Sequence, residues 1–310
     1  MPVWVVTGGS GFLGGHVLAV LKEAVGSEGQ VFSLGRRRPL DWPVERFLSA
    51  DLEDPIAVSR AFARVQPDVL IHAAGRTPPA EPDQLYRANT VATLHVLDAL
   101  RASGRAVRVV LVGSAAELGP VPSAMLPVGE DYRCRPSGPY GMSKWLATCA
   151  ALATRPPLEI VVGRVFNPIG PGTPASQAFG RFAARLNEPT TEALDVGDLD
   201  ARRDFVDVRD VARALLALAR EGRPGRVYHI GTGQSQRVGD GLRQLIARCG
   251  RTIQVRAGPG SSIPSGSSDS RADVRRIAEE VGWSATIPWT QSLDDLWEEV
   301  AGRPRLPLTE

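Results

Sequence analysis

Lysine is almost absent from this sequence of 310 residues. Of its 36 basic residues only Lys22 and Lys144 are lysines, and all the others are arginines. The 34 acidic residues leave a formal net charge of only +2, so the composition gives no reason to expect nucleic acid or a membrane surface as a partner. Because lysine is so scarce, a lysine at a meaningful spacing from another functional side chain becomes a candidate for chemistry.

Cysteine and histidine are also rare. The three cysteines are scattered without a Cys-x-x-Cys motif, which favours a reduced, cytoplasmic setting. The four histidines are isolated and give no metal-binding cluster, so we expect no metal. No apolar run approaches the roughly 20 residues that a membrane-spanning helix needs. The first residues enter an apolar, strand-like stretch directly, without the charge pattern of a signal peptide.

The first half of the chain alternates short apolar runs with segments of helix length. The runs are continuous and rich in β-branched residues, which is typical of parallel strands that are buried on both faces. Strands are expected at 3–6, 31–34, 69–74, 107–114 and 159–166, and helices at 14–25, 56–65, 89–102 and 141–153. The alternation predicts an α/β fold with a doubly wound parallel sheet.

The pattern changes after this series of strands and helices. Much of 167–205 lacks a clean period, and a helix at 208–220, a strand at 227–230 and a helix at 238–249 follow. The segment 257–270 is rich in glycine, proline and serine, and it is either a mobile surface loop or a lid over a ligand. These segments predict a smaller lobe appended to the sheet.

A glycine-rich segment, TGGSGFLGG at 7–15, follows the first expected strand and opens the first expected helix. Gly8, Gly11 and Gly14 would let the backbone approach a pyrophosphate, and the helix N-terminus would supply free N–H groups. In isolation the triplet could be a plain turn, but this context favours a dinucleotide and a Rossmann-type sheet. We place the NAD(P)-binding domain at 1–166, with 206–231 returning to it, and a C-terminal substrate-binding lobe at 167–205 and 232–310.

Arginines follow the second expected strand, where a protein that prefers NAD usually has an acidic residue. Guanidinium groups suit the 2′-phosphate of NADPH, so Arg36 is the first candidate for binding it and Arg37 the second. The alternative is a solvated basic turn. Asp51 and Leu52 are candidates for the adenine edge, although Asp51 could equally cap a helix. NADPH is therefore the expected cofactor.

Tyr140 and Lys144 have a Tyr-x-x-x-Lys spacing at the start of an expected helix. Residues four apart lie on one face of a helix, so the ammonium can stand beside the phenol and favour its ionised form. Such a tyrosine can exchange a proton near neutral pH. By itself the spacing would be an ordinary surface pair, but it follows both the glycine-rich segment and Ser114 at the end of a later strand. We therefore interpret Ser114, Tyr140 and Lys144 as a catalytic set.

This order of motifs resembles the extended short-chain dehydrogenase/reductase family. The resemblance extends over nearly the whole chain, through IHAAG at 71–75, RVFNPIGPG at 164–172, ARRDFVDVRDVARA at 201–214 and DVRRIAEEVGW at 273–283. The resemblance implies that this chain is an enzyme that binds a nicotinamide dinucleotide and acts on a small molecule.

The same resemblance implies roles for individual residues. Tyr140 would exchange a proton with the substrate oxygen, Lys144 would hold the nicotinamide ribose, and Ser114 would hydrogen-bond the same substrate oxygen. Asn89 occupies the place of a family asparagine, with a helix cap or a structural amide as the alternative. Further residues are expected to line the cofactor: Phe12, Leu13, Ala73, Ala74, Gly75 and Phe166.

Two alanines after Ser114 bear on the reaction. In the dehydratases of the family's sugar-nucleotide branch, the places of Ala115 and Ala116 hold residues that include carboxylates. A methyl group cannot perform acid–base work, so dehydration is disfavoured. Glu117 comes one residue later and would point to the opposite face if the backbone there is extended. Reduction of a ketone needs only the serine, tyrosine and lysine together with a nicotinamide hydride.

A closer resemblance is to the group of GDP-4-keto-6-deoxy-D-mannose reductases. It is carried by LPVGED at 126–131, FNPIGPG at 166–172, VGDLDARRDF at 196–205 and PGRVYHIGTGQ at 224–234. It implies NADPH-dependent reduction of the 4-keto group of a GDP- or dTDP-activated 4-keto-6-deoxyhexose, in deoxysugar biosynthesis. A nucleotide-sugar 4-epimerase with tightly held NAD is the enzymatic alternative, and a dinucleotide-sensing module is the non-enzymatic one.

Three residues are candidates for the substrate. The resemblance implies that Arg203 contacts the diphosphate, for which paired guanidinium–phosphate hydrogen bonds give the physical reason. The alternative for Arg203 is a surface salt bridge. Asn167 could hydrogen-bond a sugar hydroxyl or a phosphate, and Arg271 could supply a second phosphate contact. The stretch 257–272 lacks the family's usual pattern, so the sequence leaves the nucleotide base open.

The family resemblance also implies a homodimer. In the family, the helices that correspond to 89–102 and 141–153 form the interface between two subunits. Both segments carry apolar stripes, which could equally be part of the core.

Overall fold

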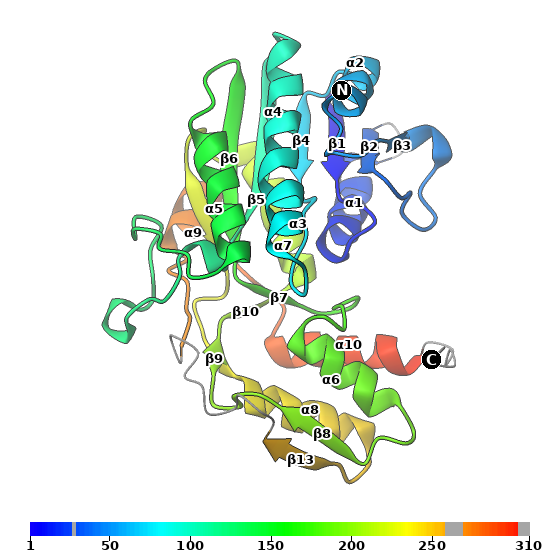
Figure 1. Ribbon diagram of the computed structural model, residues 1–310, viewed down its shortest axis with the longest axis vertical. Helices are drawn as coiled ribbons and strands as arrows, with labels where there is room; N and C mark the ends of the chain where they lie inside the picture. Colours follow the sequence, from blue (N-terminus) through cyan, green and yellow to red (C-terminus); the bar gives the residue numbers. More distant parts are fainter. Residues whose placement is uncertain (27–28, 258–268, 303–310) are drawn as a thin grey trace.

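The computed structural model describes residues 1–26, 29–257 and 269–302 of the chain. Seven parallel strands form one sheet in the order β11-β6-β5-β4-β1-β2-β3 (Figure 1). They are β1 (Val3–Thr7), β2 (Gln30–Gly35), β3 (Phe47–Ser49), β4 (Val69–His72), β5 (Val107–Ser114), β6 (Leu158–Val165) and β11 (Val227–Ile230). The predicted doubly wound, Rossmann-type sheet is confirmed.

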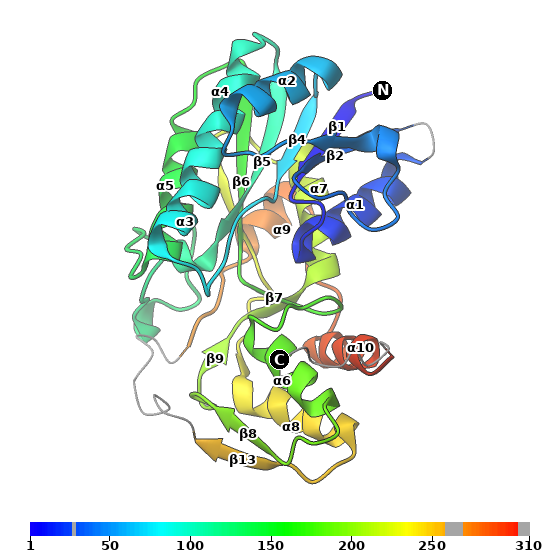
Figure 2. The same ribbon diagram turned by 45° about the vertical axis from the view of Figure 1, so that its right-hand side comes forward.

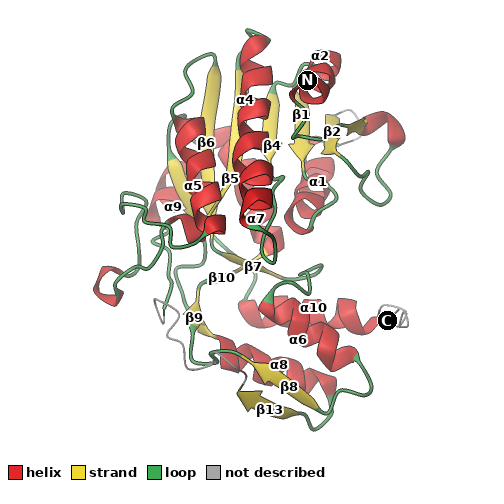
Figure 3. Ribbon diagram, viewed as in Figure 1, coloured by secondary structure: helices red, strands yellow, loops and turns green. Residues whose placement is uncertain are grey.

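Helices cover both faces of the sheet (Figures 1 and 3). One face packs against α1 (Phe12–Val25), α7 (Val208–Glu221) and α9 (Arg275–Val281), and the other against α2 (Pro55–Val65), α4 (Ala92–Ala102) and α5 (Pro139–Leu152). Successive side chains of a strand point to opposite faces, so Val6 joins the first core and Val5 the second. Both side chains are fully buried, which is why the strands read as continuous apolar runs.

The strand order reverses between β1 and β4. The chain passes from β1 to β2 on one side, and β4 adds to the other side of β1. In sheets of this type ligands bind at the carboxyl ends of the strands where the order reverses. The loop from β1 to α1 lies at this point, and so does the loop that follows β4.

A smaller group of elements lies beyond the carboxyl ends of the strands (Figure 2). It contains α6 (Ala178–Asn187), α8 (Val238–Cys249) and α10 (Trp289–Gly302), with β8 (Ala193–Val196) paired to β13 (Gln254–Ala257). We call it the second lobe. Its apolar side chains form a cluster of their own, in which Phe205 stacks on Trp289 and Phe179 meets both rings edge-on.

The chain crosses between the sheet and the second lobe more than once. Short strands mark these crossings: β7 (Asn167–Ile169) pairs with β10 (Phe205–Asp207), and β9 (Arg202–Arg203) with β12 (Gln236–Arg237). Ile277 and Trp283, although late in the sequence, pack into the sheet core beside Tyr228. The domain boundaries given above stay a prediction.

Two helices of the second lobe are not predicted by the sequence. Helix α6 falls in 167–205, which lacks a clean period, and α10 follows the motif at 273–283, within which the structure forms α9. Of the segment 257–270, residues 258–268 lie outside the described residues, and with them the choice between a loop and a lid. The remaining short elements are α3 (Pro82–Tyr86), the π-helical turn η2 (Arg87–Val91) and the 3-10 turns η1 (Val44–Arg46), η3 (Ala115–Glu117) and η4 (Ser123–Met125).

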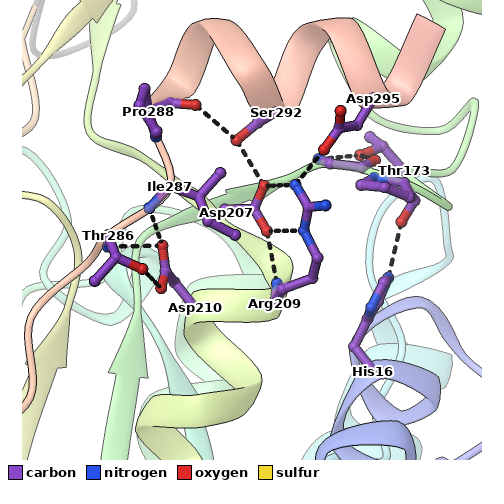
Figure 4. Close-up of polar contacts among 12 residues, drawn as sticks. His16, Thr173, Asp207, Arg209, Asp210, Thr286, Ile287, Pro288, Ser292 and Asp295 are labelled. Atoms are coloured by element: carbon purple, nitrogen blue, oxygen red, sulfur yellow. Dashed lines mark hydrogen bonds and ion pairs between the residues drawn. The ribbon is translucent and has the colours of Figure 1, made fainter. Parts of the chain in front are cut away.

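A polar junction fastens α7 to α10 (Figure 4). Asp207 caps α7 by accepting a hydrogen bond from Arg209 N at 2.8 Å, and it accepts another from Ser292 Oγ at 2.7 Å. Arg209 bridges Asp207 to Asp295, at 2.8 and 2.6 Å. Burial alone would raise the pKa of Asp207, but hydrogen bonds from Arg209 and Ser292 bring it below its ordinary value. The carboxylate of Asp207 is therefore one of the ties between the sheet and the second lobe.

Three further hydrogen bonds, from two residues, lie close to this junction (Figure 4). Asp210 accepts hydrogen bonds from Thr286 N at 3.0 Å and Ile287 N at 2.8 Å, at the entrance to α10. His16 on α1 donates through Nε2 to Pro171 O at 2.9 Å, in the loop after β7. The helix that follows the glycine-rich loop is thus attached directly to a loop of the cleft wall.

Candidate active site

A cleft of about 1140 Å³ runs along the carboxyl ends of the strands and against the second lobe. Its wall comes from the loops after β1, β2, β3, β4, β5 and β6, from α5 and from the start of α6. All but one of the site residues predicted from the sequence lie on this wall. The exception is Arg271, which is not among the described residues that line the cleft.

The glycine-rich loop forms part of the wall without side chains. Gly8 has a φ of +75°, and a Cβ there would lie 2.7 Å from Ala74 Cα. A Cβ at Gly14 would lie 2.1 Å from Gly8 O, so both positions require glycine. Helix α1 begins directly after Gly11 with no side chain capping its N–H groups. A bare loop and an open helix N-terminus fit the pyrophosphate of a dinucleotide.

Arg36 and Arg37 follow β2 on the same wall, beside Asp51 and Leu52. Arg36 Nη1 is 3.8 Å from Asp51 Oδ2, and the Arg36 side chain is 64% exposed. So long and exposed a pair contributes little, and the guanidinium can turn to a phosphate instead. Asp51 does not cap α2, because that place is taken by Asp54, which accepts from Ile56 N at 2.9 Å.

Ser114, Tyr140 and Lys144 meet on the cleft from two elements. Ser114 ends β5, and the other two lie on the first turns of α5. Lys144 is buried, and its Nζ donates to Val112 O at 2.6 Å. Burial lowers the pKa of Lys144, an effect that the nearby carboxylate of Glu117 opposes. The structure thus brings the three predicted catalytic residues together.

Tyr140 differs from the expectation in one respect. Burial raises the pKa of its phenol above the ordinary value, and the hydrogen bond with the Ser114 side chain acts in the opposite direction. The lysine was expected to lower this pKa, but its ammonium is directed at the carbonyl of Val112. The phenol of Tyr140 is therefore protonated at neutral pH, which suits a group that gives up a proton.

Asn89 lies in the π-helical turn η2 and is buried. Its Oδ1 accepts from Arg76 N at 2.8 Å, and its Nδ2 donates to Arg76 O at 3.0 Å and to Ser143 Oγ at 2.9 Å. A π turn adds a residue to a helix and is often found at functional sites. These contacts are those of a structural amide, which ties the loop after β4 to α5.

The turn after Ser114 determines which side chains face the cleft. Ser114 caps the 3-10 turn η3 by accepting from Ala116 N at 3.2 Å, and both alanines line the cleft. Glu117 is fully buried behind them and pairs with Arg164 at 3.0 Å. Glu117 does point away from the cleft as expected, but the cause is a tight helical turn and not an extended backbone.

The candidate substrate residues lie on β7 and β9. Asn167 Nδ2 donates to Asp204 O at 2.9 Å, and Arg203 Nη1 donates to Arg202 O at 2.7 Å. Burial lowers the pKa of Arg203. Arg271 Nε lies 3.4 Å from Asp269 Oδ2, and its neighbour Ser270 lines the cleft.

Other residues of the wall are not predicted by the sequence. Arg76 and Thr77 line the cleft directly after the IHAAG motif at 71–75, so their position after a strand end was an available signal. Gln177 lines it as the N-cap residue of α6, a helix that the apolar pattern of the sequence does not predict.

Two kinds of feature are absent from the described part of the chain. None of its His, Cys, Asp and Glu side chains gather in threes in a way that could hold a metal ion. Within residues 1–26, 29–257 and 269–302, no helix has the length and apolar character needed to cross a bilayer.

A doubly wound sheet that brings a glycine-rich loop and a tyrosine–lysine helix to one cleft defines a class, the dinucleotide-binding short-chain dehydrogenases/reductases. The model of one family, the NAD dependent epimerase/dehydratase family, matches residues 4–231. The chain belongs to this family, and the family predicted from its motifs is thereby confirmed.

Individual relatives match along almost their whole length. GDP-6-deoxy-D-mannose reductase of Pseudomonas aeruginosa is 31% identical in an alignment of 314 positions that covers 97% of either chain. dTDP-6-deoxy-L-talose 4-dehydrogenase (NAD(P)(+)) of Kitasatospora kifunensis is 30% identical and covers 96% of either chain. The structure of RMD from Pseudomonas aeruginosa complexed with NADPH has a TM-score of 0.83 at 28% identity, over 98% of this chain and 100% of that one. The chain is thus similar to enzymes that use a nicotinamide dinucleotide.

Proposed function

We propose that the chain is an NADPH-dependent 4-ketoreductase of a nucleotide-activated 4-keto-6-deoxyhexose. The turn after Ser114 carries the proposal, since Ala115 and Ala116 present methyl groups to the cleft and Glu117 is engaged by Arg164 behind them. This turn therefore offers no carboxylate beside Tyr140 that could move a second proton, as a dehydration requires. Two relatives, a GDP-6-deoxy-D-mannose reductase and a dTDP-6-deoxy-L-talose 4-dehydrogenase, support this substrate class.

The residues of the cleft divide the reduction between them. NADPH, when bound, supplies the hydride that C4 of the sugar receives. Ser114 donates a hydrogen bond to the keto oxygen, and Tyr140 hands its phenolic proton to the same oxygen as negative charge develops there. Lys144 would hold the nicotinamide ribose through hydrogen bonds that its ammonium donates. Each turnover thus adds one hydride and one proton to the ketone.

The proposed cofactor site uses the rest of the predicted residues. Gly8, Gly11 and Gly14 would receive the pyrophosphate, and Arg36 and Arg37 the 2′-phosphate. The adenine and nicotinamide rings would lie against apolar and backbone atoms of the wall, from Phe12, Leu13, Asp51, Leu52, Ala73, Ala74, Gly75 and Phe166. We further propose that Asn167 and Arg203, with Arg271 as a second phosphate contact, bind the sugar nucleotide.

We also propose that the enzyme is a cytoplasmic homodimer. Apolar side chains of η2, α4 and α5 remain exposed on one side of the sheet: Val91 at 37%, Leu94 at 40% and Leu146 at 38%. Two copies that pack these helices together would cover this face.

Turnover with defined substrates tests the proposed function. Purified enzyme is mixed with GDP- and dTDP-4-keto-6-deoxyhexoses, and oxidation of NADPH is followed by absorbance. Tyr140→Phe should lower kcat by about 10²–10⁴-fold without changing the Kd of NADPH, because it removes the hydroxyl that donates the proton and keeps the ring. The matched control is Tyr132→Phe. The hydroxyl of Tyr132 is exposed and donates to Pro120 O at 3.3 Å, so its loss should leave the activity unchanged.

Other outcomes separate the alternatives. Full activity of a correctly folded Tyr140→Phe variant contradicts the assignment of the proton donor. If the enzyme copurifies with NAD and interconverts 4-epimers without net oxidation of NADPH, it is a 4-epimerase. Binding of NADPH without turnover of any such sugar indicates a dinucleotide-sensing module.

A further inference from the structure

A buried line of polar side chains leads away from Ser114 behind the cleft wall. Glu117, Arg164 and His229 have exposed fractions of 0%, 3% and 0%. Glu117 Oε2 accepts from Arg164 Nε at 3.1 Å and from Arg164 Nη2 at 3.0 Å. Arg164 Nη1 lies 3.2 Å from His229 Nε2, and His229 Nδ1 lies 3.1 Å from Val128 O. These groups are more buried than the catalytic residues themselves, and the reduction described above does not use them.

The protonation state of His229 follows from its neighbours. Burial lowers the pKa of His229 to about 3, and the charge of Arg164 acts in the same direction, so the ring is neutral. The carbonyl of Val128 can only accept, so the proton lies on Nδ1 and the bare Nε2 accepts from Arg164. The guanidinium of Arg164 is thereby fixed from two sides, by a carboxylate and by a neutral ring.

The other carboxylate oxygen of Glu117 reaches the catalytic serine. Oε1 accepts from Ser114 N at 2.7 Å, while Ser114 Oγ accepts from Ala116 N, so the two residues form a reciprocal capping box. A Cβ at Gly113 would lie 2.6 Å from Glu117 Oε1, so this glycine makes room for the carboxylate. The backbone orientation of Ser114 thus depends on a carboxylate that Arg164 holds in place.

We propose that Glu117 is a positioning residue for Ser114, an inference that rests on the proposed reduction. Held by Arg164 and His229, it fixes the turn from which the Ser114 hydroxyl meets the keto oxygen. Glu117 does not touch the cleft and takes no part in proton transfer. Small displacements of a group that contacts a reacting atom are costly to the rate, so this carboxylate acts on kcat through Ser114.

Substituting Glu117 and Arg164 together tests the positioning role of Glu117 without leaving an unpaired charge in the interior. Removing one partner alone would leave the other charged and unpaired in the interior, and the protein could fail to fold. Glu117→Gln with Arg164→Met keeps an acceptor for Ser114 N, whereas Glu117→Leu with Arg164→Met removes it. We expect the glutamine pair to keep kcat within about threefold and the leucine pair to lose about 10–100-fold, with the Kd of NADPH unchanged in both. Equal kcat in the two pairs overturns the proposal.

A cycle with Ser114→Ala tests the route of the effect. If the pair acts through the serine, the leucine pair combined with Ser114→Ala should be no slower than Ser114→Ala alone. If the combined variant instead loses kcat by the product of the two separate losses, the proposal is overturned. A Ser114→Ala variant with unchanged kcat instead contradicts the use of Ser114 in the proposed function.

The exchange rate of the Ser114 amide hydrogen measures how firmly Glu117 holds Ser114, and it can be measured without substrate. The amide of Ser114 should exchange at least about tenfold faster in the leucine pair than in the glutamine pair, because only the leucine pair loses its acceptor. Equal exchange in the two overturns the proposal, whatever the activity measurements show.

The matched control is Glu159→Gln. It breaks an ion pair between Glu159 and Arg108 of 2.9 Å across the same two strands, at the ends remote from Ser114. We expect no change in kcat or in the exchange of the Ser114 amide. A change as large as that of the leucine pair would mean that loosening β5 against β6 is enough, and would overturn the specific role of Glu117.

Discussion

Tyr140 and Lys144 illustrate how a residue's surroundings decide its protonation. Their spacing alone suggests that the ammonium ionises the phenol, yet the Lys144 ammonium points at the carbonyl of Val112 and burial keeps Tyr140 protonated. A protonated phenol is the form that a reductase needs before each turnover. In the reverse reaction, oxidation of an alcohol, the phenol of Tyr140 would have to lose this proton before it could accept one from the substrate.

The proposed preference for NADPH can be tested at the two arginines that follow β2. Arg36→Ala combined with Arg37→Ala should raise the KM of NADPH by about 10–100-fold and leave that of NADH within about threefold, because only NADPH carries the 2′-phosphate. Initial rates with each cofactor give the comparison.

The control for this prediction is the next arginine in the sequence. Arg38 donates to Trp42 O and is not among the described residues that line the cleft, so Arg38→Ala should leave both KM values unchanged. Equal losses for NADH and NADPH in the double variant would contradict recognition of the 2′-phosphate.

Residues could be placed from the sequence where local order fixes them. Ser114, Tyr140 and Lys144 could be named because strand end, turn and helix start are all encoded locally. The partner of Glu117 could not, since Arg164 is 47 residues away and meets it only through the pairing of β5 with β6. Contacts across strands depend on register, which the apolar pattern leaves undetermined.

Elements could be predicted where burial is symmetric. The strands of the sheet are buried on both faces and stand out as apolar runs. Helix α6 has the helical spacing of Phe179, Phe182, Ala183 and Leu186, but it is short and follows a segment rich in proline and glycine. The π turn around Asn89 leaves no mark in the apolar period, because it shifts the helix by a single residue.

At the scale of elements, loss of one carboxylate should weaken the junction of α7 with α10. Asp207→Ala removes the N-cap of α7 and the hydrogen bond from Ser292 Oγ together, so we expect a loss of about 2–4 kcal/mol in the free energy of unfolding. Urea denaturation at neutral pH measures it.

Asp54→Ala is the matched control, since Asp54 caps α2 at the surface and should cost about 1 kcal/mol. If Asp207→Ala cost no more than this control, the bonds to α10 would add nothing to stability.

The exposed side of α4 and α5 gives a prediction for the assembly. Leu94→Glu and Leu146→Glu each place a charge on that face, and we expect either to convert a dimer to a monomer in light scattering. Val255→Glu on β13 changes a comparably exposed apolar side chain, at 40%, in the second lobe, and it should leave the dimer intact. A wild-type chain that is monomeric at micromolar concentration would contradict the proposed homodimer.

For the molecule as a whole, two buried histidines predict sensitivity to acid. Burial lowers the pKa of His72 and of His229 to about 3, from an ordinary 6.5. Between pH 6.5 and about 3 the unfolded chain takes up a proton at each site and the folded chain does not. The free energy of unfolding should therefore fall with pH throughout this window, by about 1.4 kcal/mol per pH unit for each histidine.

The prediction is checked by urea denaturation across the upper part of that window. His72→Gln and His229→Gln should each remove about one proton from the slope of stability against pH. A slope that neither substitution alters would mean that the acid sensitivity arises elsewhere.

The order of the strands also has a consequence for synthesis. β6 ends at Val165, but its neighbour β11 begins only at Val227, after β7, α6, β8, β9, β10 and α7 have been made. On the ribosome β6 therefore emerges with one edge bare, and a nascent chain that stops before β11 keeps its N–H and C=O groups open to another polypeptide. A chain that terminates anywhere in this interval would contain most of the cleft wall but would also expose the unpaired edge of β6. We expect such a truncated chain to aggregate through this edge.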